Sequence, residues 1–197
     1  MEITAAMVKE LRSKSGAGIM ECKGALKEAG GDVAEAVTVL RKKGLAKAGK
    51  KSDRETGDGA IGTYIHPGNK IGVMLQLHCE TDFVANTDDF QSLIRDVCMH
   101  IAASKTRYAS RDEVTEADLD TEREIFTHQA KESGKPENII EKIVEGKIGK
   151  FYEENCLLDQ PYIKEPGITV GEMIKQKIAI LGENITVGRF TRFEISN

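Results

Sequence analysis

The stretch IGVMLQLHCETDFVANTDDF, residues 71–90, decides the fold of the second half of this chain. Its first part alternates, with Val73, Leu75, Leu77 and Cys79 on one side and Met74, Gln76, His78 and Glu80 on the other. A period of two is typical of a half-buried β-strand. The pattern therefore predicts a strand over 71–80 with one face toward a core.

The end of the same stretch predicts a helix over 87–104. Thr87 can cap it, and Asp88 and Asp89 place negative charge near the positive end of the helix dipole. Apolar residues follow at helical spacing: Phe90, Leu93, Ile94, Val97, Cys98 and Ile101. This stripe predicts a helix that packs on the strand.

Residues 81–85 join the two elements and belong to neither stripe. They include Phe83, a large apolar side chain where a loop residue is normally polar. In one interpretation Phe83 tucks under the strand end and closes the core; in the other it is exposed and binds a partner. Asp82 likewise has two interpretations, as a structural cap or as a group that binds the partner.

The rest of the chain predicts an α+β fold. A strand over 60–66 and the turn Pro67-Gly68-Asn69-Lys70 precede the 71–80 strand and form a hairpin with it. A polar segment, 112–150, is broken at 133–136 into two helices, and Thr169 can cap a helix that ends at Gly182. A last strand over 185–195 completes a small antiparallel sheet that packs on helices.

The amino-terminal part predicts a compact bundle of three short helices. Thr4 and Asp32 can cap the first and third helices, and Gly30-Gly31 ends the second. The segment after this bundle has scarcely any large apolar side chain. We therefore divide the chain into a docking module at 1–44, a tether at 45–59, part helix and part loop, and a core at 60–197.

Composition excludes several classes of function. The 197 residues are 40% hydrophobic, enough for a real core, and no apolar run is long enough to cross a bilayer, so we expect a cytoplasmic protein that binds no membrane. The net charge is −4, and residues 1–56 carry twelve basic and eight acidic side chains, or +4. Because acids are interspersed among these basic residues and no aromatic residue accompanies them, we expect no direct binding to nucleic acid.

No catalytic or metal site emerges from the sequence. Cys22, Cys79, Cys98 and Cys156 are scattered, which predicts buried free thiols and no zinc. His78 and Cys79 point to opposite faces of a strand, so they cannot act as a pair. We therefore expect no enzyme activity, no metal and no cofactor.

Several blocks of the sequence, taken together, resemble one known family. Cys79-Glu80-Thr81-Asp82-Phe83-Val84-Ala85 resembles the signature loop of the translation elongation factor Ts family. Other blocks resemble the same family in the same order: residues 8–12, 16–23, 25–26, 64–68, 157–162, 170–172, 181–185 and 189–193. The resemblance spans nearly the whole chain. It implies a guanine-nucleotide exchange factor for translation elongation that binds elongation factor Tu, GDP-bound and nucleotide-free, and promotes GDP release.

The resemblance also implies which residues bind the partner. Thr81, Asp82, Phe83 and Val84 match the loop that intrudes beside the magnesium and phosphate region of elongation factor Tu and displaces the ion. Lys9, Arg12, Met20 and Lys23 match the surface that docks on its GTPase domain. The family further implies a ubiquitin-associated-like bundle at 1–44 and, for a chain this short, a homodimer formed through the core. The alternative is a ubiquitin-associated-like peptide-binding adaptor, which would use the bundle but not the 79–85 loop.

Overall fold

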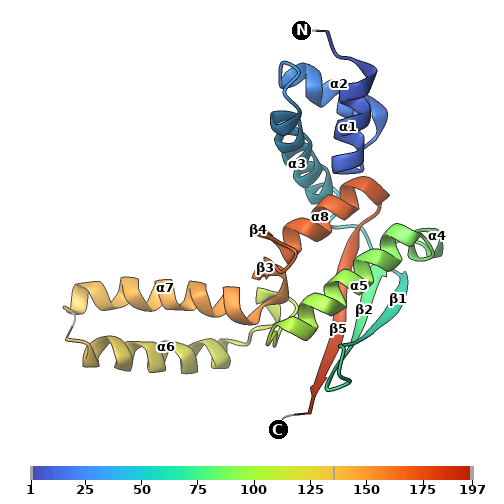
Figure 1. Cartoon of the computed structure of the whole chain (residues 1–197). Coiled ribbons are helices and arrows are strands. Elements are labelled where there is room, and N and C mark those ends of the chain that lie inside the picture. The colour runs from blue at the N-terminus through green and yellow to red at the C-terminus, as the bar shows by residue number, and fades with distance from the viewer. Residues whose placement is uncertain (1, 135, 196–197) are drawn as a thin grey trace. The chain divides into compact units, whose positions relative to one another are not determined.

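The computed structural model describes residues 2–134 and 136–195 and has the predicted α+β fold (Figure 1). The helices are α1 (Ala5–Ser15), α2 (Ile19–Glu28), α3 (Val33–Gly49), α4 (Asp82–Ala85), α5 (Asp88–Ala103), α6 (Glu116–Glu132), α7 (Glu137–Asn155) and α8 (Val170–Leu181), with 3-10 turns η1 (Arg111–Glu113) and η2 (Leu157–Asp159). The strands are β1 (Asp58–Ile65), β2 (Ile71–Cys79), β3 (Pro161–Tyr162), β4 (Glu165–Thr169) and β5 (Ile185–Glu194).

The chain divides into two compact units that interleave in sequence. The first contains the chain up to Ala60, residues 77–93 and residues 172–186. The second contains residues 61–76, residues 94–171 and the chain from Val187. The first unit therefore joins the amino-terminal helices to the segment around Phe83.

The amino-terminal helices form the predicted bundle. Thr4 Oγ1 accepts a hydrogen bond from Met7 N at 3.3 Å, and Asp32 Oδ1 accepts one from Glu35 N at 2.8 Å, so both predicted caps are confirmed. The bundle core consists of Leu11, Cys22, Ala25, Leu26, Ala29 and Ala36. α3 continues to Gly49, so residues 45–49 are helical and residues 50–57 form turns and loop.

Helix α8 packs against this bundle within the first unit. A β-carbon at Gly44 would lie 3.3 Å from the Ala179 side chain, and one at Gly16 would lie 3.3 Å from Ile180. Small residues at these points allow α8 to approach α1 and α3 closely. An ion pair of 2.7 Å between Arg41 and Glu172 adds a polar contact at the same surface.

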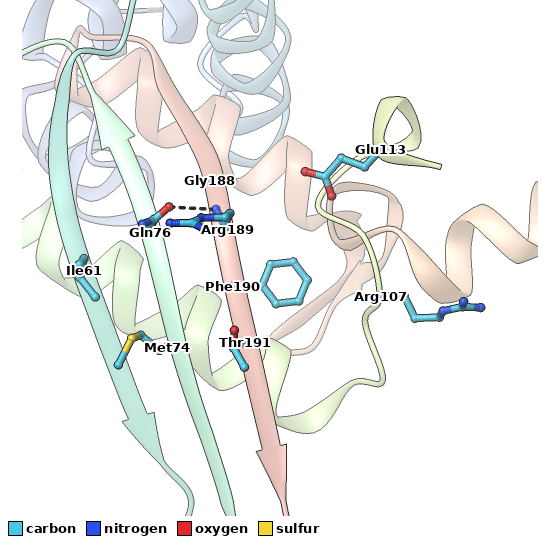
Figure 2. A pocket seen from close by; sticks show the side chains of 9 residues that line it. All are labelled: Ile61, Met74, Gln76, Arg107, Glu113, Gly188, Arg189, Phe190 and Thr191. Carbon is cyan, nitrogen blue, oxygen red and sulfur yellow. Dashed lines mark hydrogen bonds between the residues drawn. The ribbon is translucent and has the colours of Figure 1, made fainter. Parts of the chain in front are cut away.

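The predicted sheet has the order β1-β2-β5, with the last strand beside the hairpin. Figure 2 shows the arrow of β2 running opposite to those of β1 and β5, so the sheet is antiparallel. Both predicted stripes are buried: Val73, Leu75, Leu77 and Cys79 on β2, and Phe90, Leu93, Ile94, Val97, Cys98 and Ile101 on α5. These stripes form the core that supports the strand end before Phe83.

Helices α6 and α7 lie side by side as a helical hairpin in the second unit (Figure 1). The predicted break between them is confirmed by the left-handed Gly134, with φ of 70°, and by Pro136 at the N-cap of α7, while residue 135 lies outside the described residues. A small core of Val114, Leu119, Phe151 and Cys156 holds the base of the hairpin.

Candidate protein-binding site

The segment 81–85, which we call the Phe83 turn, contains one turn of helix. Thr81 is the N-cap of α4, with extended backbone, and its Oγ1 accepts from Val84 N at 3.5 Å. The N–H groups of Ala85 and Asn86 donate to the carbonyls of Thr81 and Asp82 at 3.2 and 3.0 Å. The sequence analysis assigned this connection to neither flanking element and did not foresee α4: a capping threonine and local hydrogen bonds suffice to close a single helical turn.

Phe83 points into solvent from this turn. Its side chain is 82% exposed, whereas Phe90, on the next helix, is fully buried. The interpretation in which Phe83 closes the core is therefore wrong. The turn is held by its own backbone hydrogen bonds, so the core does not depend on the Phe83 side chain. This exposed aromatic ring is therefore available to a partner.

Asp82 and Val84 flank this aromatic ring. Asp82 is exposed, and its carboxylate makes no hydrogen bond or ion pair with any other described residue. Since Thr81 caps the helix, the capping role considered for Asp82 falls to its neighbour. Val84 is half-buried and anchors the far side of the turn, because its carbonyl accepts from Thr87 Oγ1 at 2.8 Å.

The predicted docking residues lie on the exposed sides of α1 and α2. Lys9 and Arg12 are three residues apart on α1, and Met20 and Lys23 are three apart on α2, so each pair shares a helix face. Met20 is 77% exposed. Neighbouring lysines are neutralised, for example Lys14 by Glu10 at 2.7 Å, but within residues 2–134 and 136–195 the three docking cations form no ion pair. The face of α1 thus presents two unpaired cations, and the face of α2 presents an unpaired cation beside an exposed thioether.

Comparison with known proteins identifies the family. The model of the family "Elongation factor TS" matches residues 3–197. The chain belongs to the elongation factor Ts family. It is 54% identical over 196 residues to the elongation factor Ts of Solibacter usitatus, covering 100% of this chain and 92% of that protein. It is also 54% identical to that of Fervidobacterium nodosum, covering 99% of each, and 53% identical to that of Geobacter sulfurreducens, covering 98% of this chain and 89% of the other. The resemblance to the elongation factor Ts family is therefore confirmed, and the chain is a translation elongation factor.

The cysteines of this elongation factor Ts family member are buried free thiols, as predicted. Burial raises the pKa of Cys98 and of Cys156 to about 11, and burial, with the nearby Glu183 carboxylate, raises the pKa of Cys79. The thiols of Cys79, Cys98 and Cys156 are therefore protonated and weakly nucleophilic at neutral pH. No cluster of His, Cys, Asp or Glu suited to a metal ion occurs among the described residues, and no described helix is long and apolar enough to cross a membrane.

A cavity of about 440 Å³ lies on the second unit, and its lining includes none of the residues that the family resemblance assigns to the partner. Figure 2 shows its lining: Ile61, Met74, Gln76, Arg107, Glu113, Gly188, Arg189, Phe190 and Thr191. Gln76 Oε1 accepts from Arg189 N at 3.4 Å and joins β2 to β5 there. This cavity marks the sheet face that bears Ile61 and Met74, opposite the buried stripe of β2.

Sequence reasoning assigned no role to Glu183, although it lies in the matching block 181–185. Its carboxylate contacts Glu80 and Thr81 at the start of the Phe83 turn. The family resemblance was the only signal at the level of sequence that pointed to this block.

Proposed function

We propose that this chain is a guanine-nucleotide exchange factor that binds elongation factor Tu in its GDP-bound and nucleotide-free states and promotes GDP release in the cytoplasm. The observation that carries the proposal is the 82% exposure of Phe83 on a hydrogen-bonded turn. Family membership supplies the partner. The chain performs no covalent chemistry in this scheme; its effect comes from binding one state of the partner better than another.

The energetics require more than one contact. A factor that binds the nucleotide-free partner more tightly must weaken nucleotide binding by the same factor. Burial of one Phe side chain is worth roughly 1.5 to 3 kcal/mol, which shifts an equilibrium by about one to two powers of ten. We therefore assign the remaining affinity to Lys9, Arg12, Met20 and Lys23 on the module at 1–44, with 45–59 as its tether to the core.

In the proposed mechanism the Phe83 turn enters the nucleotide site of the partner beside its magnesium ion. Phe83 supplies an apolar side chain that disfavours a hydrated cation nearby, and Asp82 supplies an unpaired carboxylate that can bind partner groups released from the ion. Thr81 and Val84 hold the turn in shape. Displacement of the ion removes charge compensation from the GDP phosphates, so GDP leaves faster.

The test is release of fluorescently labelled GDP from purified elongation factor Tu, with and without a substoichiometric amount of this protein. We expect faster release at catalytic concentrations, and a smaller acceleration at high magnesium because the ion competes with the Phe83 turn. Release curves that do not change when the protein is added would overturn the proposal.

We further propose that the chain forms a homodimer through the sheet face that α5 does not cover. Arg192 Nε donates to the carbonyl of Ala102 on α5, so its neighbour Phe193 points to the opposite face. Exposed apolar side chains occur on these strands: Ile61, Ile65 and Met74, each more than half exposed, and Phe193, 68% exposed. Light scattering gives the mass in solution, and we expect Phe193→Asp to convert a dimer into a monomer. A monomeric wild-type protein would refute this part.

The peptide-binding adaptor keeps one observation in its favour. Ile19 and Met20 are 57% and 77% exposed on a three-helix bundle. Calorimetric titration with ubiquitin separates the two functions, because the exchange factor requires no ubiquitin binding and the adaptor requires no effect on GDP release.

A further inference from the structure

The Phe83 turn is connected to the loop between α8 and β5 by a charged group. Glu183 Oε2 accepts from the backbone N–H groups of Glu80 and Thr81 at 3.1 and 3.0 Å, and its Oε1 accepts from Thr81 Oγ1 at 2.6 Å. One carboxylate thus satisfies three donors on the two residues that precede Asp82. Hydrogen bonds to an ionised acceptor are shorter and stronger than neutral ones, so this contact fixes the entry to the turn.

The contact is reciprocal. The side chain of Glu80 accepts from the backbone N–H of Asn184 at 2.6 Å, while the backbone N–H of Glu80 donates to Glu183. Each segment therefore supplies one carboxylate to the other, and each carboxylate is met by donors: two N–H groups and a hydroxyl from residues 80–81, and one N–H group from Asn184. Such a pair defines the register between residues 80–81 and 183–184, because a shift of either segment breaks both bonds.

Asn184 extends the connection to the segment that follows α3. Its side chain is 3% exposed, and its Nδ2 donates to the carbonyls of Ser52 and Arg54 at 3.2 and 2.8 Å. Lys51 Nζ also donates to the carbonyl of Gly182 at 2.5 Å. Residues 51–54, which follow α3, are therefore hydrogen-bonded to residues 182–184. The same loop, between α8 and β5, holds the Phe83 turn.

We propose that Glu183 is the positioning residue of the Phe83 turn. Through Thr81 it holds Phe83 in one orientation before the partner arrives, while Asn184 ties this turn to the chain that carries the docking helices. Glu183 itself does not touch the partner. This inference rests on the proposed exchange function for its kinetic consequence, but its structural part stands without a partner.

The structural part is tested by hydrogen exchange on the free, full-length protein. Glu183→Ala removes the acceptor, and we expect the amides of residues 80–86 to exchange at least about tenfold faster, since three charge-assisted bonds are lost. Glu183→Gln restores most of the protection, because its amide oxygen can accept both N–H groups and its NH₂ can donate to Thr81 Oγ1. Glu141→Ala, an exposed substitution on α7, is the matched control and leaves residues 80–86 unchanged.

The kinetic part is tested by GDP release at increasing concentrations of each variant. We expect Glu183→Ala to lower the maximal rate about tenfold with a half-saturating concentration within about twofold of wild type, because docking through α1 and α2 is intact. A loss of folded protein alone would instead raise the half-saturating total concentration and leave the maximal rate unchanged, and Gln would not selectively restore the maximal rate. Should Glu183→Ala not fold, Glu183→Asp, which keeps the charge but withdraws it by one methylene, replaces it in both measurements.

The two proposals fail separately. Unchanged exchange at residues 80–86 in Glu183→Ala, or an unchanged maximal rate, would overturn the positioning role. A wild-type protein that does not accelerate GDP release would overturn the exchange function, and the hydrogen-exchange result would then decide the role of Glu183 by itself.

Discussion

Gly62 on β1 lies directly against Ile94 on α5, so closely that a β-carbon on this glycine would meet Ile94 Cγ2 at 1.8 Å. The Sγ of Cys98 lies 3.4 Å from the same point. Only a residue without a side chain permits this approach of strand and helix. The contact sets the spacing between the sheet and α5, the helix that follows the Phe83 turn.

Gly62→Ala is therefore expected to destabilise the protein by about 2 to 3 kcal/mol, since the added methyl group overpacks the core and forces Ile94 from its position. Urea denaturation followed by circular dichroism measures the change. Gly146→Ala is the control: apart from its chain neighbours and the backbone of its own helix, no described atom lies within 4 Å of a β-carbon placed there, and the substitution gains helix propensity in α7. Gly146→Ala should raise the free energy of unfolding by up to about 1 kcal/mol. Equal effects of the two substitutions would contradict the packing argument.

The sequence could predict those elements whose apolar residues repeat with a single period over many residues. β2 and α5 are of this kind, and their stripes are buried as expected. α4 contains only Asp82–Ala85, too short for any period to show, so it was missed. The β3–β4 pair was missed for the same reason, because Pro161–Tyr162 and Glu165–Thr169 carry too few residues for an alternation.

The candidate site divides in a similar way. Exposure of Phe83 was one of two interpretations, and the structure decided between them because burial depends on packing that no local pattern encodes. The role of Glu183 could not be predicted from the sequence, because its hydrogen bond to Thr81 joins residues that are 102 positions apart. The assignments of Lys9, Arg12, Met20 and Lys23 to the partner came from the family resemblance and stay predictions.

The docking surface can be tested without disturbing the Phe83 turn. We expect Arg12→Ala combined with Met20→Ala to raise the half-saturating concentration in GDP release about tenfold or more while the maximal rate changes little, because both side chains are exposed and contribute to binding alone. Lys14→Ala is the matched control on α1, since Lys14 is already paired with Glu10. A fall in maximal rate at unchanged half-saturation would place these residues in the release step instead.

His100 makes stability depend on pH. Gln160 Oε1 accepts from Thr106 Oγ1 at 3.0 Å and lies 2.8 Å from His100 Nε2, so Nε2 carries the proton, and Nδ1 accepts from Ile163 N at 3.3 Å. This arrangement requires the neutral ring. Burial lowers the pKa of His100, and the bond to Gln160 offsets this only in part. Asp96, one turn earlier on α5, forms an ion pair of 2.7 Å with Lys164.

The sign follows from proton binding. The unfolded chain takes up a proton at this histidine near its ordinary pKa of about 6.5, before the folded protein does. The free energy of unfolding therefore falls as the pH drops through this value toward the lower pKa of the folded protein. Urea titrations at several pH values measure the slope. His100→Gln should make the free energy of unfolding less dependent on pH. The side chain of His128 is 76% exposed, so His128→Gln should leave this pH dependence unchanged. Identical slopes for wild type and His100→Gln would refute the assignment.

Phe83→Ala tests the exchange mechanism most directly, because the side chain can be removed without entering the core. With 82% of Phe83 exposed, we expect the free energy of unfolding to fall by less than about 1 kcal/mol, while GDP release from elongation factor Tu slows about tenfold or more. Phe90→Ala is the matched aromatic control, since Phe90 is fully buried seven positions later. That variant should lose about 3 to 5 kcal/mol of stability, and the fraction that remains folded should keep normal exchange activity. Melting curves and GDP release measured on the same preparations separate the two effects. A Phe83→Ala protein that is stable and fully active would show that the exposed ring takes no part in nucleotide exchange.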